Sequence, residues 1–446
     1  MNISKENVDE LNAVVTLTVD KADYEPKVEE SLKNYRKKVS MPGFRPGHVP
    51  ANLVKKMYGK QILAEEVNRL FSTSLNNYIV ENKIDIVGEP LPHEGQEPID
   101  FDKEIDTINF KFDLGLKPAL DIEINDKIKL PAYTIDVTDE TVDKLMHDQL
   151  SRLSTSQKVD VVSEKSFVEA EIEQEGGAKN ENGFIGINNL KGEQDKFIGA
   201  KAGDVVKFDI RKAYDDDNSF IAYALGISAE DAANVKGEAT ATIKSISEQK
   251  EPELNQELFD KLLGEGKASN EEEFKARIRE HAAKLNSLEE DYRFTLDLRD
   301  ALLKKYKVEL PEAFLRRWIT LVNADNKEFT PEVLDKEFPK FIEDLKWQVV
   351  KNAVLKKNDI KITEEDIVNF AKNSTVAQFA QYGIMNIPED KLDEYAKNQV
   401  RSNKEQYEHY VEGASNYVIS KFAKEHAKIE SKAISHQDFA KLFENK

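Results

Sequence analysis

The chain has 446 residues and contains no cysteine. It therefore cannot form disulfide bonds, use a thiol nucleophile or bind zinc through thiolates. It also lacks a run of about 18 apolar residues, which excludes a membrane-spanning helix, and we expect no membrane partner. Residues 1–10 have neither the basic start nor the apolar stretch of a signal peptide, so we expect a cytoplasmic protein.

Motifs for catalysis and cofactor binding are missing as well. The seven histidines show no metal-binding spacing, and the chain has neither a phosphate-binding loop nor a dinucleotide fingerprint. Gly176 and Gly177 are typical of a turn. We therefore expect no cofactor and no metal.

The charge is acidic overall and unevenly distributed. Lys and Arg number 64 and Asp and Glu number 84, so the net charge is −20, which argues against indiscriminate nucleic-acid binding and against a DNA partner. Residues 31–60 nevertheless carry eight cations and no acid. These cations are Lys33, Arg36, Lys37, Lys38, Arg45, Lys55, Lys56 and Lys60. Such a segment suits a phosphate backbone or an acidic protein surface.

Hydrophobic periodicity predicts an α+β domain over residues 1–116. Val15, Leu17 and Val19 alternate with threonines, which indicates a half-buried strand, and 108–116 alternate in the same way. Apolar residues at helical spacing predict a helix over about 24–39. Further helices are predicted from Ala51 and from Gln61, packed on a small antiparallel sheet.

The rest of the chain divides into a linker, a β-rich domain and a helical domain. Residues 117–149 form the linker, which we expect to pack with the C-terminal domain. Short alternating runs at 167–172, 205–210 and 239–246 indicate that 150–250 are a small β-rich domain. Residues 251–446 read as almost wholly helical, with capping boxes predicted at Ser269–Glu272 and Thr363–Asp366. The predicted fold class is therefore multidomain α+β, with an extended all-α C-terminal domain.

The segment 41–50 contains three prolines and two glycines, so it is predicted to be an exposed loop. Phe44 and Arg45 stand at its tip. An exposed aromatic ring beside an arginine offers apolar area and planar hydrogen bonding to a partner. The alternative is a plain helix–helix turn with Phe44 in the core and a solvated basic face.

The loop sequence GFRPGHVP at 43–50 resembles the GFRxGKxP signature of trigger factor, the bacterial ribosome-associated chaperone family. Weaker resemblances at 136–142, 251–259 and 308–314 follow in the order of that family. The resemblance implies an ATP-independent chaperone that docks on a large-subunit protein and RNA near the ribosomal exit tunnel, and that binds unfolded nascent chains. The implied ribosome-binding residues are Gly43, Phe44, Arg45, Gly47, Lys37 and Lys38.

One departure from the family pattern concerns two cations. Pro46 and His48 stand where the family often has lysine. We therefore expect ribosome binding that persists but is weaker and more salt-sensitive. A ribosome-independent holdase is the competing function.

The resemblance to this family implies that residues 150–250 form a domain similar to the FKBP-type prolyl isomerases. That activity needs an aromatic-lined apolar pocket that favours the twisted amide. In a gap-free comparison the pocket aromatic is replaced by Glu193. Phe197, Tyr214 and Phe220 are the remaining candidates for pocket walls. Either the domain is a degenerate spacer or client surface, or it is an active isomerase.

Apolar side chains scattered over the helical domain are candidates for client binding, because no single patch is large enough to drive self-aggregation. The candidates are Phe329, Phe338, Phe341, Trp347, Phe379, Tyr382 and Met385. The alternative for each is a place in the core.

Overall fold

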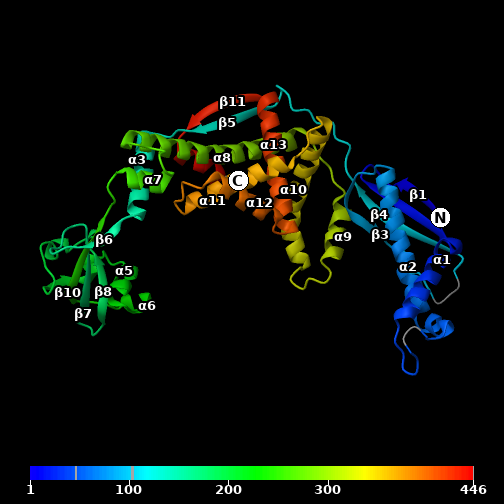
Figure 1. Cartoon of the computed structure of the whole chain (residues 1–446), viewed down its shortest axis with the longest axis horizontal. Coiled ribbons are helices and arrows are strands. Elements are labelled where there is room, and N and C mark those ends of the chain that lie inside the picture. Colours follow the sequence, from blue (N-terminus) through cyan, green and yellow to red (C-terminus); the bar gives the residue numbers. More distant parts are fainter. Residues whose placement is uncertain (46–47, 102–104, 445–446) are drawn as a thin grey trace. The chain divides into compact units, whose positions relative to one another are not determined.

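The computed structural model of the chain describes residues 1–45, 48–101 and 105–444 (Figure 1). These residues form two compact units, and each unit is assembled from three separate chain segments. The first comprises Met1–Ala132, Asp291–Ile367 and Tyr407–Lys432; the second comprises Tyr133–Glu290, Val368–Gln406 and Ala433–Lys446. Both units therefore bring together residues that are distant in sequence.

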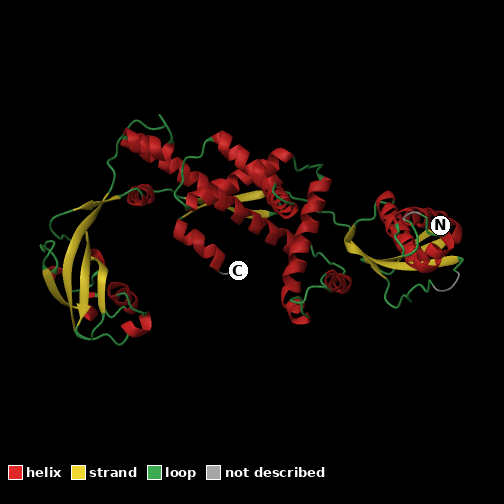
Figure 2. Ribbon diagram, turned by 60° about the horizontal axis from the view of Figure 1, so that its bottom comes forward, coloured by secondary structure: helices red, strands yellow, loops and turns green. Residues whose placement is uncertain are grey.

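The N-terminal part of the first unit is a four-stranded antiparallel sheet in the order β1-β2-β4-β3, with two helices packed on one face (Figures 1 and 2). Its elements are β1 (Asn2–Asn7), β2 (Asn12–Asp20), α1 (Lys21–Lys38), α2 (Ala51–Glu81), β3 (Ile86–Pro92) and β4 (Thr107–Leu116). Val15, Leu17 and Val19 are fully buried. They pack in one cluster with residues of α2, which confirms the predicted strand.

Two local features differ from the expectation. The predicted break between helices from Ala51 and from Gln61 is wrong, because α2 continues through both positions. A glycine inside a helix costs about 1 kcal/mol, and burial of Ile62 and Val67 beyond Gly59 offsets that cost. The strand β1 is an addition: its side chains are mostly exposed, and pairing with the backbone of β2 holds it.

The remainder of the first unit is largely helical and surrounds a second core. Its helices are α8 (Glu271–Lys305) from Asp291 onward, α9 (Glu312–Val322), α10 (Pro331–Lys357) and α13 (Lys404–His426) from Tyr407 onward. Ile122 and Ile128, from the segment predicted as a linker, are buried in this core with Leu298 and Val350. The strand β5 (Lys129–Ile135) pairs with β11 (Lys428–Ile434), so the C-terminal region is not purely helical.

The second unit contains a five-stranded sheet. Its strands are β6 (Thr155–Lys158), β7 (Ser166–Gln174), β8 (Lys179–Gly186), β9 (Val205–Asp209) and β10 (Glu238–Lys250). The order is β6-β10-β7-β8, and β9 also pairs with β10. Short helices cover the buried face: α4 (Ile210–Ala213), α5 (Asn218–Leu225), α6 (Ala229–Ala232) and the 3-10 turns η1 (Ile187–Asn189) and η2 (Gln194–Lys196). The alternating runs predicted at 167–172, 205–210 and 239–246 lie in β7, β9 and β10, except that Ile210 begins α4.

The second unit also contains longer helices: α3 (Asp139–Arg152), α7 (Gln256–Leu263), the N-terminal part of α8, α11 (Glu364–Gln381) from Val368 onward, α12 (Glu389–Arg401) and α14 (His436–Glu444). Of these, α3, α7 and α8 meet in a small apolar cluster. Phe259 and Phe274 stack there, with ring centroids 4.8 Å apart. The capping box at Thr363 and Asp366 is confirmed by reciprocal hydrogen bonds. The one predicted at Ser269–Glu272 is wrong by one residue, because Asn270 caps Glu273.

Candidate functional site

The loop between α1 and α2 has a folded base. Val39, Val49 and Val54 are buried in a small cluster of their own. Arg36 Nε donates a hydrogen bond to the carbonyl of Val49 (2.8 Å), which ties α1 to the far side of the loop. The base therefore fixes where the tip projects.

The tip is a tight turn that exposes Phe44. The N–H of Phe44 donates to the carbonyl of Met41 (3.1 Å), and Gly43 between them has φ +86°, which a residue with a side chain rarely adopts. Phe44 is 40% exposed, and Arg45 beside it is exposed too. The turn conformation thus presents a ring and a guanidinium to solvent side by side.

The lysines on either side of this tip in the sequence are exposed and form no ion pairs among the described residues. Lys33, Lys37, Lys38, Lys55 and Lys56 are all exposed. In the described part of the chain, none of the five forms an ion pair with a carboxylate. Of the predicted docking residues, Gly47 lies outside the described residues, as does Pro46.

The predicted pocket aromatics of the middle domain are mostly internal. Phe197 is fully buried and meets Phe208 edge-on, with ring centroids 5.0 Å apart. Tyr214 is 4% exposed, and its burial raises the pKa of its hydroxyl to about 12. Its ring stacks on Phe220, which is the one of the three candidates that reaches the surface. An isomerase pocket made of these residues stays a prediction.

The seven predicted client-binding residues fall in different places. Phe338 and Trp347 are buried, as the core alternative has it, whereas Tyr382 is 71% exposed. Trp347 donates through Nε1 to Asn416 (3.0 Å). The side chains of Phe379 and Met385 are half-buried in the second unit, where Phe379 meets Tyr395 and Met385 joins the α3–α7–α8 cluster.

Phe329, Phe338 and Phe341 do come together, in an apolar hollow between α9 and α10 of about 310 Å³. The sequence reasoning missed the residues that α9 contributes, among them Trp318 and Val322. Trp318 and Val322 are four residues apart on one helix, which places them on the same face. This spacing could have identified them from the sequence. Val322 is 61% exposed, so the rim of the hollow is open and apolar.

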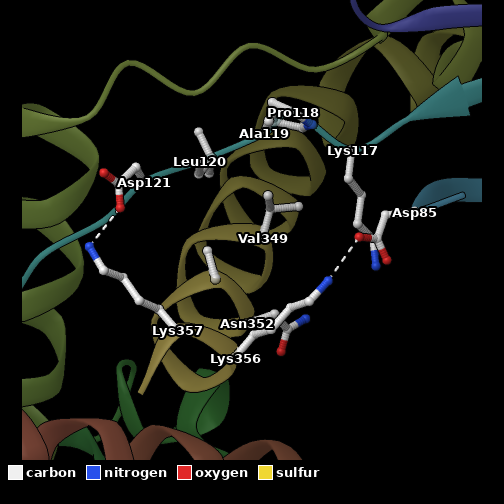
Figure 3. A pocket seen from close by; sticks show the side chains of 11 residues that line it. Asp85, Lys117, Pro118, Ala119, Leu120, Asp121, Val349, Asn352, Lys356 and Lys357 are labelled. Carbon is white, nitrogen blue, oxygen red and sulfur yellow. Dashed lines mark hydrogen bonds and ion pairs between the residues drawn. The ribbon is translucent and has the colours of Figure 1, made fainter. Parts of the chain in front are cut away.

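A second hollow, of about 550 Å³, lies between residues 117–121 and α10 (Figure 3). Two of its three lysines form ion pairs, drawn as dashed lines in Figure 3: Lys356 Nζ lies 3.1 Å from Asp85 Oδ2, and Lys357 Nζ lies 2.6 Å from Asp121 Oδ1. The residues of both ion pairs line the hollow. It therefore resembles neither a cationic nor a purely apolar site.

The described residues offer neither a metal cluster nor a membrane-spanning helix. Within 1–45, 48–101 and 105–444, no group of His, Asp and Glu is placed to hold a metal ion. Over the same ranges, none of the helices combines the length and apolarity that crossing a bilayer requires.

Three family models match the chain in sequence order. "Bacterial trigger factor protein (TF)" matches residues 1–149, "Probable trigger factor, FKBP-like domain" matches 156–251, and "Probable trigger factor, C-terminal domain" matches 290–443. Together they span nearly the whole chain.

Relatives are similar over most of their length. A trigger factor of Campylobacter jejuni subsp. jejuni serotype O:6 is 29% identical over 340 residues, which cover 71% of each chain. A trigger factor of Pseudomonas fluorescens is 25% identical over 463 residues, covering 99% of this chain and 98% of that protein. A solved structure reported as "Promiscuous Substrate Recognition in Folding and Assembly Activities of the Trigger Factor Chaperone" matches with a TM-score of 0.50 at 15% identity, covering 95% of this chain and all of that one, which shows the fold alone.

Proposed function

The chain belongs to the trigger factor family, and we propose that this ribosome-associated chaperone docks through the loop between α1 and α2. The partner surface is a large-subunit protein together with ribosomal RNA near the exit tunnel. The protein acts in the cytoplasm and shields emerging polypeptides without ATP.

One observation carries the docking assignment. Five exposed lysines without ion-pair partners in the described residues flank an exposed Phe44–Arg45 pair in the sequence. An unpaired cation gives up only water when it meets a phosphate, and counterions released from the RNA add to the gain. The ring of Phe44 supplies apolar area, and Arg45 supplies hydrogen bonds in a fixed plane.

The hollow between α9 and α10 is the proposed place for client side chains. Phe329 and Phe341 line it, and Val322 stands exposed at its rim. Its apolar character suits a Leu, Ile or Phe side chain of an unfolded segment. Its small size limits the affinity of a single contact, which permits release.

Co-sedimentation with ribosomes tests the docking assignment. Phe44→Ala/Arg45→Ala is expected to weaken binding by at least about 10-fold, because it removes both anchor side chains. The matched control is Val80→Ala/Lys111→Ala, which changes an exposed apolar residue and an exposed cation elsewhere in the same domain. We expect the control to pellet like wild type.

Two other results are informative. Equal pelleting of the anchor variant and wild type would show that another surface docks. A wild-type protein that stays in the supernatant would favour the ribosome-independent holdase.

A further inference from the structure

The N-terminal sheet is pressed against α9 at two glycines. A Cβ atom at Gly115 would lie 2.6 Å from Phe314 Cδ1, and one at Gly88 would lie 3.2 Å from Trp318 Cδ2. A side chain at Gly115 would force Phe314 to shift, and one at Gly88 would be tight against Trp318 and strained, because φ there is +71°. The strands β3 and β4 therefore lie close against α9. Val87 and Leu91 of β3 are buried in the same core as Phe314.

An ion pair clamps the same contact. Arg317 of α9 donates through Nη2 to Asp113 Oδ2 on β4 (2.6 Å), and its Nη1 lies 3.1 Å from Glu94 Oε1. Both Arg317 and Asp113 are mostly buried, at 23% and 17% side-chain exposure. Burial opposes the charge, but hydrogen bonds to Asp113 and Glu94 outweigh it and raise the pKa of Arg317. His93 Nδ1 lies 2.5 Å from the second oxygen of Asp113 and holds that carboxylate in place.

The helix that carries the clamp also lines the client hollow. Trp318 follows Arg317 directly, touches the sheet at Gly88 and forms part of the wall of the hollow. Its indole N–H is buried and has no hydrogen-bond partner in the described part of the chain. Packing alone therefore fixes the orientation of this ring, and the sheet supplies one of the surfaces against which it packs.

We propose that Arg317 is a positioning residue, which by clamping α9 to β4 holds Trp318 as a wall of the client hollow and so couples attachment of the N-terminal sheet to client binding. The two states are a sheet attached to α9 and a sheet detached from it. Detachment removes the support at Gly88 and lets the Trp318 ring turn. The proposal rests on the proposed function, namely that the hollow between α9 and α10 takes client side chains.

Thermodynamic linkage makes the coupling reciprocal. If attachment strengthens client binding by some factor, an occupied hollow strengthens attachment by the same factor. The domain that carries the ribosome-docking loop therefore senses whether the hollow is filled.

The experiment measures both ends of the coupling in the full-length protein. The chain has no cysteine, so Asn77→Cys on α2 and Lys340→Cys on α10, both exposed, accept a fluorescent donor and acceptor without background. The client probe is a short fluorescein-labelled peptide rich in Leu and Phe, titrated by anisotropy into unlabelled protein. Arg317→Gln and Asp113→Asn break the clamp. Lys356→Gln is the matched control, because it removes an ion pair between α10 and Asp85 that is well exposed.

Arg317→Gln is expected to broaden the donor–acceptor distance distribution and to weaken peptide binding roughly 5- to 20-fold. Asp113→Asn is expected to act alike, and the double variant no more than either single one. Lys356→Gln should leave both readouts within about twofold, since exposed ion pairs contribute little. Circular dichroism verifies the fold of each variant. If the clamp variants unfold, Gly115→Ala tests the same contact by displacing Phe314.

Two outcomes overturn the proposal. One is a loosened distance distribution with unchanged peptide affinity, which shows no coupling; the other is an unchanged distance distribution, which shows no clamp. Phe341→Ala separates these from a failure of the proposed function. If that variant binds the peptide like wild type, the hollow is not the client site.

Discussion

Two phenylalanine–arginine pairs, one in the docking loop and one on α9, differ in whether the arginine has a carboxylate partner among the described residues. In the docking loop, Phe44 and Arg45 are exposed. On α9 the guanidinium of Arg317 lies 6.0 Å from the ring centroid of Phe314, and Asp113 neutralises it. Because Asp113 binds Arg317, this pair connects α9 to β4. In the loop no acid is present within residues 31–60, so the same chemistry is left available to a partner molecule.

Lysine shows the same contrast in a more extreme form. The Lys351 side chain is 2% exposed; its Nζ contacts Glu412 and lies 3.0 Å from Asn416 Oδ1. Lys37 and Lys38 are exposed and have no ion-pair partner among the described residues. Changes at the buried lysine should therefore alter stability, and changes at the exposed pair should alter binding alone.

The largest effect is expected at Lys351. Lys351→Ala should lower the free energy of unfolding by about 3 kcal/mol, because it deletes a buried four-carbon stem and leaves a cavity. Lys351→Met keeps the stem and should cost about 1 kcal/mol or less, since Glu412 reaches solvent. Denaturant titration of both variants measures the difference. Equal losses would mean that the charge, not the packing, matters here.

The pH dependence of the same variants has a definite sign. Burial lowers the pKa of Lys351 below 10.5, although Glu412 raises it in part. Between the lowered pKa and 10.5 the unfolded chain binds more protons at this site, so stability rises with pH in the alkaline range. Lys351→Met should remove that rise.

The next effect concerns the unpaired lysines. Lys37→Glu/Lys38→Glu should weaken ribosome binding roughly 10- to 100-fold and reduce the salt slope by about one for each phosphate that is no longer neutralised. Its unfolding midpoint should match wild type. The control Lys340→Glu/Lys361→Glu makes the same charge change at exposed positions outside the loop. If the control loses as much affinity for the ribosome, the effect follows from the net charge and not from the position of the two lysines.

The last effect, which is absent at neutral pH, is expected at a buried aromatic, the counterpart of exposed Phe44. With its pKa raised from 10 to about 12, Tyr214 keeps its proton in the folded state after the unfolded chain has lost it. Stability should fall by about 1.4 kcal/mol per pH unit across that window, and Tyr214→Phe should remove this loss. Alkaline denaturation of the two proteins measures it. Tyr223→Phe, at a side chain 68% exposed, is the control.

The sequence predicted those elements whose conformation depends on neighbouring residues, such as the strand β2 and the loop between α1 and α2. The alternation of Val15, Leu17 and Val19 and the prolines of the loop were sufficient because side-chain periodicity and fixed φ act over a few residues. The strands β1 and β11 could not be found in this way. Their residues are largely exposed, and pairing with a partner strand holds them. The continuous α2 was missed because burial of Ile62 overrides the cost of Gly59.

The candidate sites also differ in whether neighbouring or distant residues form them. Phe44 and Arg45 lie within one short loop whose sequence carries the whole signal. The hollow joins Trp318 of α9 to Phe341 of α10, and the clamp joins Arg317 to Asp113 across about half the chain. No single-sequence pattern encodes such pairings. The burial of Phe197 likewise follows from the packing of the whole β-rich domain.

The arrangement of the cores fixes an order of folding during synthesis. Every buried residue of the N-terminal sheet cluster lies before Lys117, so that core can close once its own segment has emerged. The core that contains Ile122 also needs Ile419 and Ala423, and it stays incomplete until nearly the entire chain has been made. The loop proposed to dock on the ribosome is thus ready early, whereas the proposed client hollow forms in a core that closes last.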